Sequence, residues 1–143
     1  MTHRTRSSVS LLIWLHVLVV ILHGVAHAGA GVPFTSLSGS VVVVLAIGVV
    51  IGIGPLVALS LLSTRWFHWG ALLLCLCMLG SLLFGVWNHF VLPGPDNLAS
   101  LSAGIWQLPF RITAYLLALI DAAGTIVGAW LFFSVKRARA ANP

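Results

Sequence analysis

The sequence predicts an all-α polytopic membrane protein, folded as an antiparallel bundle of four transmembrane helices. Of its 143 residues, 60% are hydrophobic and only 6% are charged, which leaves too little polar surface for a soluble domain. Four apolar stretches are long enough to cross about 30 Å of hydrocarbon, which takes about 20 helical residues each. Residues 1–143 are therefore expected to form a single transmembrane domain, with spans at about 8–30, 38–62, 67–90 and 111–134.

A helix is the expected form of each span, because a lone segment in lipid must satisfy its own backbone hydrogen bonds. None of the four stretches alternates as a barrel strand does. Gly29, Gly31 and Pro33 end the first span, and residues 63–65 connect the second and third so tightly that these two should form a helical hairpin. Pro55, which follows two glycines, predicts a kink midway along the second span.

The longest connection covers residues 91–110 and contains three prolines. Its leucine and tryptophan residues suit a loop that lies against the membrane interface. Since the other connections are short, this is the loop large enough to cover a site.

Positive charge predicts the orientation of the bundle. The basic residues gather at one end of the spans, apart from Arg111, which stands at the other end: Arg4, Arg6, Arg65, Lys136, Arg137 and Arg139. By the positive-inside rule, both termini should face the cytoplasm from the cell (inner) membrane. Because these residues stand at helix ends and form no binding stripe, the formal charge of +5 does not predict a nucleic-acid partner.

The N-terminus allows a second interpretation. Two arginines, an apolar run and Ala26-His27-Ala28 imitate a cleavable secretory signal with its small-residue site. Cleavage would leave three spans. The apolar run is long for a signal core of about 7–15 residues, which favours a first transmembrane helix.

Three histidines of the first span form the most informative pattern in the sequence. His16, His23 and His27 are spaced by seven and four residues, and at 100° per residue these offsets return to within about 20° of one direction. All three side chains should therefore share one helix face. His23 and His27 should lie near the outer interface, with His16 roughly 10 Å deeper at 1.5 Å per residue.

The end of the third span should reach the same outer level. His89 stands there, and Asp96 follows in the loop after Pro93-Gly94-Pro95. Histidines from two helices can then converge, with Asp96 as a fourth ligand or as an acceptor for an imidazole N–H. Neutral imidazole suits copper, zinc or iron, so a metal site of His23, His27, His89 and Asp96 is expected.

Three alternatives to this metal site remain open from spacing alone, and one of them is that the histidines handle protons or a substrate. Haem b needs one imidazole on each face of the porphyrin, and histidines at positions 16, 23 and 89 could supply them. The histidines could also serve as hydrogen bonds between helices, each contributing about 0.6 kcal/mol.

Asp121 is the only acid inside a span and should face the bundle interior, because an unpaired carboxylate at mid-bilayer costs about 2.5–3.5 kcal/mol. By depth, its candidate partner is His16, and such a pair could orient an imidazole, pass a proton or be purely structural. Arg111 is interpreted as an interface anchor more readily than as a substrate clamp. Two pairs of glycines, Gly48 with Gly52 and Gly124 with Gly128, indicate close helix approach.

The chain also resembles a family of small uncharacterised prokaryotic membrane proteins with four expected helices. The resemblance rests on the histidine-rich first span, on His89-Phe90 followed by the loop that ends at Asp96, and on residues 113–124. It covers most of the chain and implies the fold but no activity. Proteins of that kind often have a further histidine where this chain has Asn88, which argues against a crowded multi-metal centre and leaves a single ion or haem open.

Three functions are consistent with these patterns. The first is an outward-facing metal or haem site used in redox chemistry or metal handling. The second is a non-catalytic scaffold within a homo-oligomer or a larger membrane complex, and the third is a small proton-coupled transporter that uses Asp121. The sequence shows no phosphate loop and no nucleophile with a matched base, so it does not indicate whether the protein is an enzyme.

Overall fold

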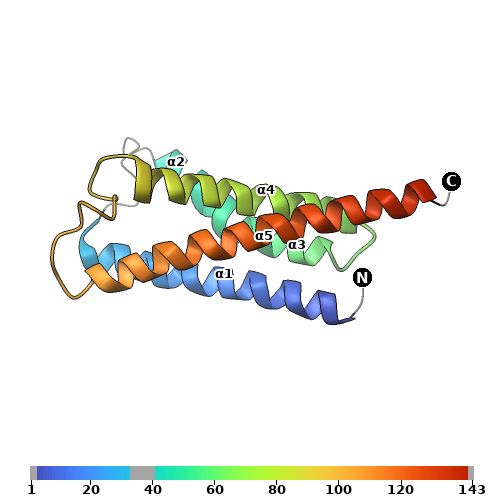
Figure 1. Ribbon diagram of the computed structural model, residues 1–143, viewed down its shortest axis with the longest axis horizontal. Helices are drawn as coiled ribbons and strands as arrows, with labels where there is room; N and C mark the ends of the chain where they lie inside the picture. Colours follow the sequence, from blue (N-terminus) through green and yellow to red (C-terminus); the bar gives the residue numbers. More distant parts are fainter. Residues whose placement is uncertain (1–2, 33–40, 142–143) are drawn as a thin grey trace.

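The computed structural model describes residues 3–32 and 41–141, and within these ranges every regular element is helical. Four helical segments run antiparallel along an elongated bundle (Figure 1). Their elements are α1 (His3–Ala30), then α2 (Val41–Gly48), η1 (Val49–Ile53) and α3 (Gly54–Leu61), then α4 (Phe67–Val86) with η2 (Trp87–Val91), and finally α5 (Gln107–Ala141). The all-α prediction is confirmed, and the expected start of the second span at residue 38 lies outside the described residues.

Three of these segments are long and apolar enough to cross a membrane. They are Thr5–Ala30, Phe67–Val91 and Gln107–Ser134, and a shorter apolar helix covers Leu45–Leu61. Large apolar side chains on their outer faces are exposed, including Leu11, Leu119 and Ile126 at 70%, 68% and 69%. Such surfaces are compatible with contact to lipid and indicate a membrane protein.

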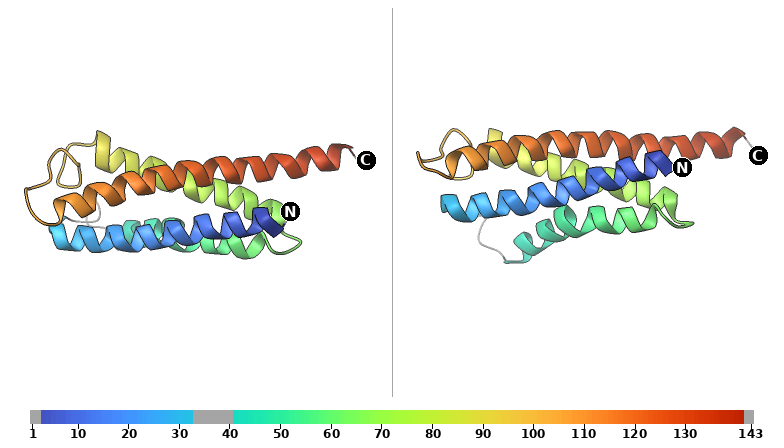
Figure 2. Two further views of the ribbon diagram at one scale, coloured as in Figure 1. Left: turned by 60° about the horizontal axis from the view of Figure 1, so that its bottom comes forward. Right: turned by 90° about the horizontal axis from the view of Figure 1, so that it is seen from below.

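The second segment is interrupted where the sequence predicts a kink. A π-helical turn, η1, stands immediately before α3, in which Pro55 is buried near the first position. Proline has no N–H to donate and tends to break the regular helical ladder. Figure 2 shows α2 diverging from the other helices beyond this turn.

The half of the bundle near both chain ends, named the inner half in contrast to the outer end opposite it, has a close-packed apolar core. Its buried residues come from α1, α3, α4 and α5: Val9, Ile13, Ala58, Leu62, Ala71, Leu74, Met78 and Leu131. A Cβ atom placed on Gly128 would lie 2.6 Å from the backbone nitrogen of Cys75, and one on Gly124 would lie 2.7 Å from the Met78 side chain. The glycine pair of α5 therefore allows close approach to α4, as its spacing predicts.

The outer end of the bundle is closed by the loop between η2 and α5. Leu98 and Leu101 of this loop pack on Ala26 of α1 and on Phe110 and Ala114 of α5. The loop is tied to η2 because Leu98 N–H donates to the carbonyl of His89 at 2.9 Å. Both chain ends lie at the opposite end of the bundle (Figure 1).

Candidate metal centre

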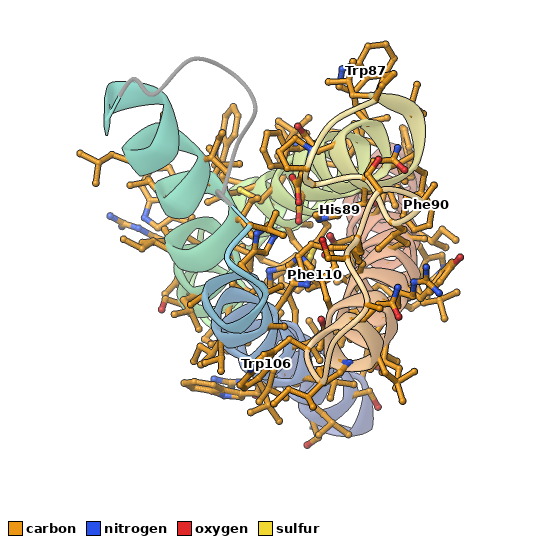
Figure 3. The ribbon with its side chains drawn as sticks, turned by 90° about the vertical axis from the view of Figure 1, so that its left-hand side faces the viewer. Trp87, His89, Phe90, Trp106 and Phe110 are labelled. Atoms are coloured by element: carbon orange, nitrogen blue, oxygen red, sulfur yellow. The ribbon has the colours of Figure 1, made fainter. Side chains whose placement is uncertain are left out.

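Three histidines meet beneath the outer loop, two of them from α1 and one from η2. His23 and His27 are one helical turn apart, and the π turn at the end of the third segment carries His89. All three are buried, with 8%, 3% and 6% of their surface exposed. Figure 3 shows His89 and Phe110 near the centre of the bundle, whereas Trp87 and Phe90 point outward.

The three imidazoles approach one another through the same ring atom. The Nε2 atom of His23 lies 3.0 Å from Nε2 of His89 and 3.2 Å from Nε2 of His27. One ligand atom from each residue lies within 4.8 Å of the others, so this cluster could hold a metal ion. A tetrahedral ion with bonds of about 2.0–2.1 Å would separate its ligand atoms by about 3.3–3.4 Å.

The other ring nitrogen of each histidine faces an oxygen atom. Nδ1 of His89 lies 3.0 Å from the backbone carbonyl of Asp96, and Nδ1 of His27 lies 3.4 Å from the carbonyl of Val32. A carbonyl can only accept a hydrogen bond. When His89 is neutral, its proton therefore belongs on Nδ1, and Nε2 keeps its lone pair. His27 faces an oxygen acceptor from both nitrogens, since its Nε2 also lies 3.4 Å from Oδ1 of Asp96.

Thr113 of α5 determines the same tautomer for His23. Its hydroxyl donates to the carbonyls of Pro109 at 2.8 Å and Phe110 at 3.1 Å, as a helical threonine commonly does. The threonine oxygen is then free to accept from Nδ1 of His23, which lies 2.8 Å away. This residue was missed by sequence reasoning, because nothing in the sequence shows which face of α5 meets α1 at that depth.

The convergence of three Nε2 atoms is the chemically decisive feature of the cluster. Neutral acceptors about 3 Å apart repel unless a proton or a cation stands between them. Nitrogen lone pairs from imidazoles whose Nδ1–H groups are held by oxygen acceptors are the usual arrangement around a protein-bound metal. The geometry therefore fits a cation held by Nε2 of His23, His27 and His89.

Asp96 places a carboxylate at the edge of this cluster. Its Oδ1 atom lies 3.4 Å from Nε2 of His27 and 3.1 Å from Nδ1 of His89. The residue is only 2% exposed, and a buried carboxylate is costly unless a positive charge or hydrogen bonds offset it. Beside three neutral imidazoles, a bound cation would provide that charge.

Phe110 forms the apolar wall of the site. Its ring centroid lies 4.9 Å from that of His23, 4.6 Å from that of His27 and 5.5 Å from that of His89. The ring is fully buried, so it excludes water from one side of the cluster. Exclusion of water strengthens electrostatic interactions inside the site.

A second polar group, made by His16 and Asp121, lies deeper in the bundle. Nδ1 of His16 lies 2.8 Å from Oδ1 of Asp121, and the Ser81 hydroxyl donates to Oδ2 of the same carboxylate at 2.6 Å. Nε2 of His16 donates to the carbonyl of Ile51 at 2.9 Å. That carbonyl stands four residues before Pro55, which has no N–H to offer it, so the interrupted helix supplies the acceptor.

A cavity of about 310 Å³ connects the two polar groups. Residues of α1, α2, η1, α4, η2, α5 and the outer loop line it, and it reaches both the histidine cluster with Asp96 and the inner Ser81–Asp121 pair. A Cβ atom on Gly48 or Gly52, which also line it, would meet no atom within 4 Å. This glycine pair therefore borders open space in the described part of the bundle. The close approach that its spacing predicts, inside the bundle or in a dimer, is not made within these residues and stays a prediction for a second copy of the chain.

Arg111 lies outside the cluster. Its guanidinium donates to the carbonyl of Leu98 at 3.1 Å, and the residue is exposed at the start of α5. This contact ties α5 to the outer loop. His68 lies outside the cluster as well, because it stacks on Phe132 of α5 with ring centroids 4.3 Å apart.

The positions of the rings favour a single ion over haem. Metal–imidazole bonds of about 2 Å place two nitrogens on opposite faces of a porphyrin about 4 Å apart. The Nε2 atoms of His23 and His89 are 3.0 Å apart, which is closer than this.

No protein-family model, curated protein or solved structure matches the chain. The function of the cluster is therefore argued from its own geometry.

Proposed function

We propose that this protein binds a transition metal ion within a four-span bundle of the cell membrane, through the Nε2 atoms of His23, His27 and His89. The observation that supports this most strongly is that the Nε2 atoms of the three rings converge while each Nδ1 atom faces an oxygen atom. Copper, zinc and iron are the ions that suit neutral imidazole.

Asp96 completes the proposed site, either as a fourth ligand or as the acceptor that balances the charge of the ion. Three imidazole ligands with a weaker fourth position are typical of sites that bind a further molecule at the metal. The cavity beneath the histidines offers room for such a molecule. Redox chemistry or metal handling is the use that this arrangement supports.

The proposed topology places the site at the outer face of the membrane. Arg6 and Arg65 lie at the end of the bundle that holds both termini, and the Arg6 guanidinium donates to the Ser63 hydroxyl there at 2.7 Å. With both termini in the cytoplasm, the loop over the histidines faces outward. This topology needs four spans, and the second helical segment, which carries the shorter apolar helix, completes them together with the three longer ones.

Elemental analysis of the purified protein in detergent tests the proposal. We expect one copper, zinc or iron ion per chain, and we expect His89→Ala to lose it. His68→Ala is the matched control, because it removes an imidazole that has no part in the cluster and should keep the metal content of the wild type. Equal metal content in His89→Ala and wild type, in folded protein, would refute the site.

A metal-free wild-type protein that co-purifies with other membrane proteins would instead favour a scaffold role. The histidines would then serve as hydrogen bonds between helices. In that case alanine at position 89 should weaken the complex and leave metal content at background in every variant.

A further inference from the structure

The cavity between the histidine cluster and the inner carboxylate is almost entirely apolar along its sides. Val20, Ile47, Leu82, Phe84 and Leu117 are among the residues that line it. Polar groups stand only at its two ends. Apolar pockets with a few placed polar groups are the usual form of small-molecule sites.

The separation of the two ends limits the length of an occupant. His23 and His16 are seven residues apart on α1, and His89 and Ser81 are eight apart on the antiparallel third segment. At 1.5 Å per residue, the polar ends are roughly 10–12 Å apart along the bundle. A six-membered ring with an oxygen atom at each end matches this separation when each oxygen makes one hydrogen bond or metal contact to the polar group nearest to it.

The charges at the two ends select a neutral occupant. At the inner end, Nδ1 of His16 lies 2.8 Å from Oδ1 of Asp121, so the carboxylate already has an imidazole as a partner within the protein. Asp121 is also hydrogen-bonded to Ser81 and therefore offers no free carboxylate to an amine. Asp96, at the outer end, offsets the charge of an ion held by the histidines, which leaves less positive charge for an anionic head such as that of a fatty acid.

The cavity reaches the surface of the described bundle beside the second helical segment. Gly48 lines the cavity and is itself exposed. Its neighbours Leu45 and Val49 are 63% and 52% exposed, and these apolar side chains would contact lipid in a membrane. The route into the cavity therefore leads from the hydrocarbon and not from water.

We infer that this cavity binds a membrane-soluble aromatic ring with oxygen atoms at opposite ends, of the quinone or hydroquinone class. One oxygen is directed toward the histidine cluster and the other toward Asp121, whose carboxylate accepts the hydroxyl proton of the hydroquinone, with an apolar tail leaving past Gly48. The outer contact rests on the proposed metal site, whereas the inner contact and the apolar walls do not.

Binding of a decyl-substituted benzoquinone and its hydroquinone, measured with the protein in lipid nanodiscs, tests the inference. Decylbenzene serves as the ligand control because it has the same ring and tail without oxygen. Gly52→Leu fills the cavity from a position where a side chain meets no atom within 4 Å, and Gly104→Leu places the same side chain in equally open space in the outer loop.

We expect one ring per chain in the wild type and in Gly104→Leu, and at least about tenfold weaker binding in Gly52→Leu. Gly52→Leu should keep the metal content of the wild type, which also shows that it folds. Asp121→Asn should weaken binding of the hydroquinone and leave the affinity for decylbenzene unchanged. A purely structural role of Asp121 would not produce this difference.

Three results would overturn the inference: equal affinity for decylbenzene, displacement of the quinone by oleate at equal concentration, or unchanged binding in Gly52→Leu. Metal content measured on the same preparations separates this inference from the proposed function. A metal-loaded wild type that binds no ring refutes the inference alone. Stoichiometric ring binding by a protein without metal supports the cavity and refutes the metal site.

Discussion

Thr113 offers a sharp test of the cluster, because it acts on the metal only through the tautomer of His23. Its oxygen accepts from Nδ1 of His23 at 2.8 Å, while its own proton is directed to the carbonyls of Pro109 and Phe110. Thr113→Val keeps the shape of the side chain and removes this acceptor. We expect the variant to bind metal more weakly.

The size of the effect follows from the two states of His23. Without metal, the ring in the valine variant can move its proton to Nε2 and donate to His89, which lies 3.0 Å away. With metal, Nε2 must supply its lone pair, so Nδ1–H is buried against valine without a partner. An unpaired buried donor costs about 1–3 kcal/mol, which corresponds to roughly 5–150-fold in the metal dissociation constant.

A competition titration against a chromophoric chelator, with the protein in detergent, measures this change. Thr125→Val is the matched control, since Thr125 donates to the carbonyl of Asp121 at 2.8 Å on the same helix and has no role at the cluster. Thr113→Ser keeps an acceptor and should restore most of the affinity. Equal metal affinity in Thr113→Val, Thr125→Val and wild type would refute the proposed tautomers and the role of His23.

Three further predictions concern stability in detergent, followed by thermal unfolding with tryptophan fluorescence. Gly128→Ala should lower the free energy of unfolding by about 1–3 kcal/mol, because the new Cβ atom meets the Cys75 backbone. Gly48→Ala should leave the free energy of unfolding unchanged. Equal losses in the two variants would contradict the different surroundings of the two glycine pairs. Asp121→Ala should cost about 3–5 kcal/mol by leaving His16 buried without its partner, and much less when His16 is already leucine. Metal at about 100 times its dissociation constant should raise the free energy of unfolding by about 2.7 kcal/mol. If a chelator that removes the metal left the unfolding midpoint unchanged, this would contradict a metal site in the folded state.

Much of the fold could be predicted because membrane helices depend on local composition. Each apolar stretch must form its own backbone hydrogen bonds, so hydropathy alone indicates the segments that became α1, α4 and α5. The position of the π turn η1 followed from Pro55 and its glycines. The second π turn, η2, has no comparable signal, since Trp87–Val91 contains neither glycine nor proline.

The candidate site was predictable as far as helix periodicity extends. Spacing alone placed His16, His23 and His27 on one face, and equal depth brought His89 to the same level. The partners of the second ring nitrogens were not predictable, because they depend on how α5 and the outer loop are rotated against α1. Thr113 is the clearest example, since a threonine in a membrane helix usually bonds only to its own backbone.

The glycine pairs show the limit of motif reasoning. Gly48 with Gly52 and Gly124 with Gly128 have the same spacing, yet one pair borders a cavity and the other packs against α4. The motif shows that one face of a helix carries only small side chains. Whether the space over that face is filled depends on the element that lies opposite it.

The central claim is that three imidazoles hold one metal ion, and X-ray absorption spectroscopy of the metal-loaded protein tests it most directly. We expect three imidazole ligands at about 2.0 Å from the metal in the wild type and in His68→Ala. His89→Ala, which loses its metal on purification, should show two imidazole ligands when it is loaded with excess metal. A spectrum without imidazole scattering, or one that is identical in the wild type and in His89→Ala, would contradict it.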